Sequence, residues 1–163
     1  MVGMKSSDFL VFTQVPDAMG LTIDMKSELE SCTVSSVQNR DVKQFSKKHL
    51  FDGDLETCWS SDQGLPQWIS INLKEPVALC ALKMQFQGGF AGQHCSILAD
   101  GGNNTDFYPE DNNSVQSFQL PKNCRGKNVK ITFNSSTDFF GRIVIYGLWL
   151  EKCEDSCEHS KSD

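Results

Sequence analysis

The chain has 163 residues, of which 39% are hydrophobic, and a net charge of −6; this is enough for one domain with a buried core and short for two. Residues 1–31 and 151–163 each carry two lysines against five acidic residues, so the segment between them is neutral overall. A neutral domain has no global field that attracts phosphates, and we expect no direct contact with nucleic acid. No run approaches the roughly 18 apolar residues of a membrane-spanning helix, and we expect no membrane partner.

The N-terminal part of the chain, residues 1–31, has only brief apolar runs and no clear period. We expect a largely mobile extension over 1–31, a folded domain over 32–151 and an acidic disordered tail over 152–163. The seven cysteines are odd in number and have no repeated spacing, and the apolar run near the N-terminus is too short for a signal peptide. These features favour a reducing compartment, the nucleus or cytosol, in which the cysteines are mostly free thiols.

An oxygen-rich turn, LFDGDLETCWSSD at residues 50–62, follows a segment (43–49) that has at most one helical turn. Asp52, Asp54 and Thr57 place side-chain oxygens close together, and Gly53 permits the positive φ of a tight turn. Such a turn is either capped by its own side chains, the favoured interpretation, or closed around a hard cation such as Ca²⁺.

Seven strands follow from alternating or short apolar runs separated by turn residues: 34–37, 68–73, 77–87, 96–99, 115–120, 129–133 and 143–150. No long amphipathic helix competes with them, so no crossover helices are available for parallel pairing. The pattern predicts an all-β fold, an antiparallel β-sandwich of the jelly-roll kind.

The run at 50–59, the segment QWISINL at 67–73 and the closing segment DFFGRIVIY at 138–146 together resemble the galactose-binding-like, or discoidin, domain of coagulation factors V and VIII. Longer runs at 45–52, 85–90, 106–114 and 137–146 resemble, within that group, a family of small intracellular proteins that associate with and repress an orphan nuclear receptor. The resemblance covers about residues 33–150. It implies a galactose-binding-domain-like sandwich of the discoidin type.

The resemblance also implies two kinds of site. Many members hold one calcium ion, for which Asp52, Asp54 and Thr57 could be loop ligands; the usual glutamate of the final strand is missing, and the nearest carboxylate is Glu151. Calcium takes about six to eight oxygen ligands, and losing this carboxylate weakens the site, so the capped turn remains the better interpretation and no other cofactor is expected.

Ligands in this superfamily bind at loops at one end of the sandwich. Candidates for a partner- or ligand-binding surface are His49, Phe90, Tyr108, Phe139 and Arg142. Arg142 first suggests a structural ion pair four residues after an aspartate.

The remaining aromatic residues have structural interpretations. Trp59, Trp68 and Trp149 are expected in the core or between the sheets. Adjacent Phe139 and Phe140 should point to opposite sides if they lie on a strand, so that one is exposed, unless a loop folds over it.

No nucleophile or metalloprotease motif accompanies the three histidines, and the expectation is a non-enzymatic protein. The resemblance implies a monomeric interaction module in the nucleus, and also in the cytoplasm, that binds a nuclear receptor and represses its transactivation by hindering its engagement with DNA. Two alternatives remain open: a calcium-assisted carbohydrate-binding domain and an adaptor subunit of a larger complex.

Overall fold

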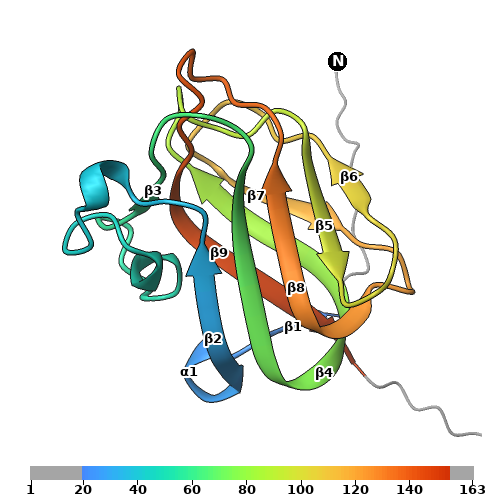
Figure 1. Cartoon of the computed structure of the whole chain (residues 1–163). Coiled ribbons are helices and arrows are strands. Elements are labelled where there is room, and N and C mark those ends of the chain that lie inside the picture. Colours follow the sequence, from blue (N-terminus) through green and yellow to red (C-terminus); the bar gives the residue numbers. More distant parts are fainter. Residues whose placement is uncertain (1–19, 155–163) are drawn as a thin grey trace, which may run out of the picture.

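The longest strand, β4 (Gln67–Phe86), builds the fold because it belongs to both layers of a β-sandwich. The protein is described from a computed structural model that covers residues 20–154 (Figure 1). Ile69, Ile71 and Leu73 of β4 are buried, as their alternation with polar residues predicts. The pairing register shifts between Asn72 and Val77, and there the strand passes from one layer to the other.

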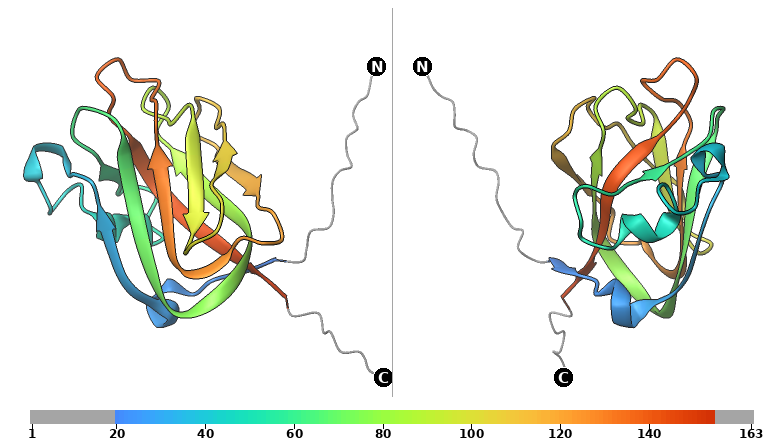
Figure 2. Two further views of the ribbon diagram at one scale, coloured as in Figure 1. Left: turned by 45° about the vertical axis from the view of Figure 1, so that its right-hand side comes forward. Right: turned by 90° about the vertical axis from the view of Figure 1, so that its left-hand side faces the viewer.

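Each layer is antiparallel throughout. The first contains the beginning of β4 between β2 (Leu29–Val34) and β8 (Arg125–Phe133), followed by β5 (Cys95–Ala99) and β6 (Thr105–Phe107). The second contains the end of β4 between β7 (Val115–Gln119) and β9 (Val144–Cys153), whose other edge pairs with β1 (Gly20–Thr22) and β3 (Trp59–Ser60). The predicted all-β jelly-roll sandwich is confirmed, and Figure 2 shows the two layers from the side.

The core lies between these layers and is centred on three aromatic rings. Phe133 packs edge-on against Phe86, with ring centroids 6.2 Å apart, and lies 6.3 Å from Trp59. All three side chains are fully buried, and the Trp59 Nε1 donates to the Ser36 carbonyl at 3.0 Å, which satisfies the indole in the core.

The strand predictions hold best where the alternation was strong. The segments predicted at 68–73 and 77–87 are one continuous strand, because exposed Lys74, Glu75 and Pro76 join them without leaving the extended conformation. The very short strands β1, β3 and β6 were not predicted. Between residues 20 and 154 the helical content is limited to α1 (Met25–Glu28) and two 3₁₀ turns, η3 (Gln38–Arg40) and η4 (Lys47–Leu50).

Residues 20–31 differ from the expected mobile extension. Strand β1 pairs with the end of β9, Asp24 caps α1 by accepting from the Lys26 backbone N–H at 3.1 Å, and Ile23 is buried in the core. The domain therefore includes these residues, which the sequence alone had assigned to the extension because the apolar positions are few and widely spaced. Lys152 and Cys153, expected in the tail, end β9, whereas residues 1–19 and 155–163 lie outside the described residues.

Two of the three tryptophans are not in the core. Trp68 and Trp149 are half-buried on outer sheet faces, since each lies on the polar side of its alternating strand. Lys130 lies over the Trp68 ring, 5.0 Å from the centroid. Over residues 20–154, no helix has the length and apolar character needed to cross a membrane.

Candidate functional site

The connections 87–94, 108–114 and 134–143 meet at one end of the sandwich, the upper end in Figure 1, and we call them the end loops. The backbone N–H of Gly89 donates to Asp111 Oδ1 at 2.7 Å, and that of Thr137 donates to the Ala91 carbonyl at 2.8 Å. These bonds hold loops far apart in sequence as one surface.

An ion pair between Asp138 and Arg142 fixes the last of these loops. Asp138 Oδ2 accepts from both the backbone N–H and the Nε of Arg142 at 3.0 Å, and Oδ1 accepts from an Nη at 3.4 Å. The bonds from the arginine lower the pKa of the Asp138 carboxyl below its ordinary value. The expected structural pair is present, and it orients the guanidinium as well.

The guanidinium of Arg142 is placed against two aromatic rings. Its central carbon lies 5.0 Å from the Phe90 ring centroid and 5.9 Å from that of Phe140. Arg142 and Phe90 border a hollow of about 200 Å³. Its other walls come from the segment before β4, from the residue after β4 and from β9: Gln38, Phe45, Cys58, Ser60, Gln87 and Val144. Two sequence-predicted residues, Phe90 and Arg142, are therefore brought together.

The most exposed aromatic residue of the described chain is Phe139, at 94%. Phe140 is also exposed, and its ring meets that of Phe139 edge to face with centroids 5.2 Å apart. The expectation that one of the pair is buried is wrong, because both residues occupy a turn rather than a strand. Gly141 closes this turn at φ +85° and donates its N–H to the Asp138 carbonyl at 3.0 Å.

Exposed Leu65 lies beside this turn: a Cβ added at Gly141 would come within 3.0 Å of the Leu65 Cγ. The Gly64 N–H also donates to the Phe140 carbonyl at 2.9 Å. We call Leu65, Phe139 and Phe140 the apolar tip. Leu65 was not predicted as a site residue, since a single leucine in a loop carries no signal without its neighbours.

Tyr108 lies in a different part of the end loops. It is exposed and stacks on His94, with ring centroids 5.3 Å apart and planes 12° from parallel. His94 Nε2 is 3.6 Å from Asp106 Oδ1. The stacking makes His94 a further surface residue that sequence analysis missed, because it is separated from Tyr108 by a strand pair.

His49, in contrast, is buried at the end of η4. Its Nδ1 lies 3.1 Å from the Cys58 carbonyl oxygen, so the ring ties η4 to the segment before β3. The structure therefore gives His49 a packing role, and its buried side chain is not part of the exposed surface.

The oxygens of the turn at 52–57 are used within the turn itself. Asp52 Oδ1 accepts from the Asp54 N–H at 2.9 Å, Asp52 Oδ2 accepts from the Thr57 hydroxyl at 2.7 Å, and Asp54 Oδ1 accepts from the Glu56 N–H at 2.9 Å. Glu151 forms an ion pair with Lys83 at 2.7 Å. Within residues 20–154 no three histidine, cysteine or acidic side chains are grouped to hold a metal, so the geometry fits the capped turn.

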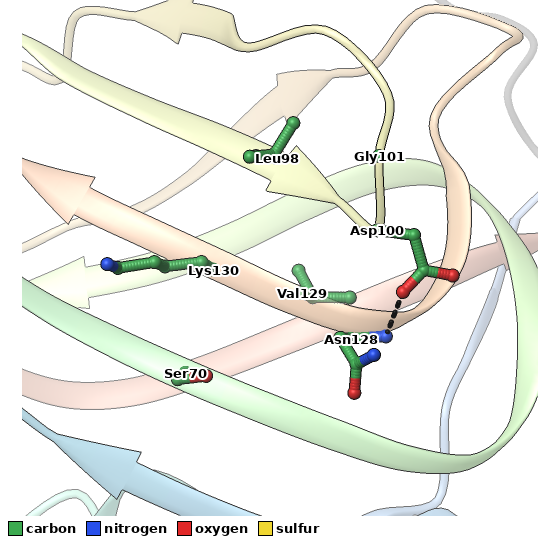
Figure 3. Close-up of a pocket in the computed structure, with 7 residues that line it drawn as sticks. All are labelled: Ser70, Leu98, Asp100, Gly101, Asn128, Val129 and Lys130. Atoms are coloured by element: carbon green, nitrogen blue, oxygen red, sulfur yellow. Dashed lines mark hydrogen bonds between the residues drawn. The ribbon is translucent and has the colours of Figure 1, made fainter.

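A larger hollow, about 490 Å³, lies on the outer face of the first layer and was not anticipated (Figure 3). Asp100 at its rim has φ +48°, and its carboxylate accepts from the backbone N–H groups of Lys127 at 3.0 Å and Asn128 at 2.9 Å. These bonds lower the pKa of the Asp100 carboxyl. The carboxylate thus ties the residue after β5 to the backbone of β8, which is a structural role.

The sandwich and its end loops place the molecule in the class of discoidin-like binding domains. The sequence profile of the F5/8 type C domain matches residues 31–145, and the chain belongs to this family. Among solved structures, an F5/8 type C domain from Bacteroides fragilis has a TM-score of 0.68 at 15% identity, over 85% of this chain and 99% of that one. The family 32 CBM from C. perfringens NanJ, in complex with galactose, has a TM-score of 0.67 at 19% identity, over 82% of this chain and 99% of that one.

Closer relatives are found by sequence. The chain is 49% identical over 120 residues to the nuclear receptor 2C2-associated protein of Danio rerio, over 71% of this chain and 85% of the relative. It is 48% identical to the protein of the same name from Homo sapiens, over 71% of this chain and 86% of the relative. The resemblance to nuclear-receptor-associated proteins is therefore confirmed.

Proposed function

We propose that this protein is a non-enzymatic interaction module that binds a nuclear receptor through its end loops and lowers the receptor's transactivation by hindering its engagement with DNA. The relatives' name supports the class of partner. On this proposal the protein acts in the nucleus, and also in the cytoplasm, as a monomer whose contacts are with protein.

The observation that carries the proposal is the exposure of Phe139 on a fixed turn. A phenylalanine at 94% exposure gains hydrophobic free energy only when another surface covers it, and the Asp138–Arg142 pair already holds its turn in place. Aromatic residues next to arginine are also the residues that most often dominate the binding energy of protein interfaces.

A binding titration with purified receptor tests this. Phe139→Ala is expected to cost about 2 kcal/mol of binding free energy, or roughly 30-fold in Kd. Leu21→Ala is the control, since Leu21 is about half exposed but lies on β1, at the opposite end of β9. Equal affinities of both variants and the unchanged protein would contradict the use of the end loops.

The mechanism is tested separately with labelled DNA. If the module hinders DNA engagement, adding it should release the receptor from its DNA, and Phe139→Ala should require a correspondingly higher concentration. Formation of a ternary complex on DNA would contradict this part of the proposal while leaving receptor binding intact.

Carbohydrate binding is the second candidate, favoured by the hollow between Phe90 and Arg142. The guanidinium lies over the Phe90 ring, however, so this ring face is not free to stack on a sugar without moving Arg142. Galactose that competes with receptor for the unchanged protein, but not for Phe90→Ala, would favour this second function.

A further inference from the structure

Two cysteines lie close together at the end of the sandwich opposite to the end loops. Cys80 is on β4 and Cys153 is the last residue of β9, and the Cys80 thiol lies beside Gly20, the residue of β1 that pairs with Cys153. Both are half-buried, so reagents can reach the pair. Nothing in the proposed receptor-binding function uses them.

The strand register explains why the two thiols meet. The pairing of β4 with β9 shifts between Leu79 and Ala81, which leaves Cys80 at an irregular position beside the end of β9. Gly20 of β1 pairs with Cys153 from the other side, and a Cβ added at Gly20 would lie 2.8 Å from the Cys80 Sγ. The Cys80 side chain therefore reaches towards Gly20 of β1, where its neighbours on β9 are Glu151 and Cys153.

Cys153 also opens on a hollow of about 510 Å³. Arg125 and Lys152 bring positive charge to its wall, Glu154 brings one negative charge, and Leu21 and Val77 contribute apolar surface. Lys152 is held by Glu28 at 3.3 Å, whereas Arg125 is exposed and makes no ion pair within residues 20–154. Such a wall suits a small molecule with carboxylates on a short apolar chain.

We propose that Cys80 and Cys153 are a reversible redox pair, converted to an intramolecular disulfide by a small carboxylate-bearing disulfide such as glutathione disulfide. Cys153 acts first because it lines the hollow, and Cys80 completes the reaction from the sheet. The pair is thus a modification site at the end of the sandwich opposite to the proposed receptor surface.

The exchange has two balanced steps. The Cys153 thiolate attacks one sulfur of glutathione disulfide, so that a mixed disulfide forms, the glutathione S–S bond breaks and one glutathione leaves with the proton that Cys153 lost. Cys80 then attacks the Cys153 sulfur, and the second glutathione leaves with the proton of Cys80. The protein loses two electrons and two protons, and one glutathione disulfide becomes two glutathione thiols.

The order of attack follows from the surroundings of Cys80. Burial, and next the charge of Cys153, raise the pKa of the Cys80 thiol to about 11. Cys80 is therefore almost entirely protonated at neutral pH and is a poor first nucleophile. Once the mixed disulfide holds a sulfur beside it, the reaction is intramolecular and needs only a small thiolate fraction.

The test treats the full-length reduced protein with glutathione disulfide, alkylates the remaining thiols and maps disulfide-linked peptides by mass spectrometry. We expect a Cys80–Cys153 linkage that added reduced glutathione removes. Cys80→Ser should stop at one glutathione on Cys153, and Cys153→Ser should lose both the linkage and that adduct.

Two matched variants guard against neighbouring thiols. Burial, and next the charge of Cys153, raise the pKa of the Cys124 thiol, so Cys124 is a neighbour of Cys153, and Cys157 is near it in sequence. Cys124→Ser and Cys157→Ser should each keep the Cys80–Cys153 linkage. Absence of a Cys80–Cys153 peptide from the unchanged protein, or linkage of Cys153 to Cys124 or Cys157 instead, would overturn the proposal. The map of the unchanged protein decides this even if a serine variant fails to fold.

Discussion

The replacement Asp138→Ala should destabilise the domain by about 2 kcal/mol at pH 7. The carboxylate accepts two hydrogen bonds at 3.0 Å and a third, longer one at 3.4 Å from Arg142, and hydrogen bonds to charged groups are worth roughly 1.5–3 kcal/mol. The Arg142 side chain is 29% exposed, so water can replace part of the hydrogen bonding that Arg142 loses when Asp138 is removed. We therefore take the lower part of the energy range.

The loss should appear in thermal unfolding as a decrease in Tm of roughly 4–8 °C, given the usual sensitivity of domains of this size. Arg142→Lys is the matched variant, because it keeps the charge and loses the planar fork; we expect about half of the loss.

The difference between Asp138→Ala and the unchanged protein should depend on pH. The pKa of Asp138 is lower in the folded protein than in the unfolded chain, where it is about 3.9, so the pair stabilises fully above that value. As pH falls from about 4 through the folded pKa, the unchanged protein loses this contribution and the two stabilities converge. A difference that is zero at pH 7, or that does not decrease as pH falls below the unfolded pKa of about 3.9, would refute the assignment.

Three further outcomes are expected. Phe133→Ala should cost about 3–5 kcal/mol in urea unfolding because it leaves a cavity between two buried rings, and a cost below 1 kcal/mol would contradict the described core. Chelation should leave Tm unchanged, and Asp52→Ala should cost about 1 kcal/mol that added Ca²⁺ does not restore; rescue by Ca²⁺ would favour a metal site. Gly141→Ala should cost more than Gly53→Ala, since both have positive φ but only Gly141 has backbone atoms within 3.1 Å of the new Cβ, and calorimetry would detect the reverse order.

The sequence predicts the sandwich well because its long strands alternate strongly. Strand β4 over residues 69–73 and 82–86 and strand β8 over residues 129–133 present an apolar residue at every second position, so one face of each of these segments must be buried. Strand β1 has three residues, and its place depends on pairing with residues more than 120 positions away, which no local pattern encodes. The same limit explains why Trp68 and Trp149 were expected in the core: their size suggests burial, but their register puts them outside.

Only those parts of the candidate site that depend on local sequence spacing were predictable. The four-residue spacing of Asp138 and Arg142 is local, and the pair forms as expected. The contact of Arg142 with Phe90 joins the loops after β4 and β8, and the buried His49 ring contacts the carbonyl of Cys58. Such contacts between distant segments are set by topology and become visible only in three dimensions.

The sharing of β4 by both layers has a consequence for how the protein opens. Because β4 is hydrogen-bonded in both layers, separating the layers requires breaking the backbone hydrogen bonds of β4 in both of them. Neither layer can therefore unfold by itself. Amide protons at the middle of β4 should then exchange with solvent only when the whole domain unfolds, while those of β1 and β6 exchange through local fraying. A binding surface built on the ends of such a strand is anchored to the most slowly opening part of the molecule.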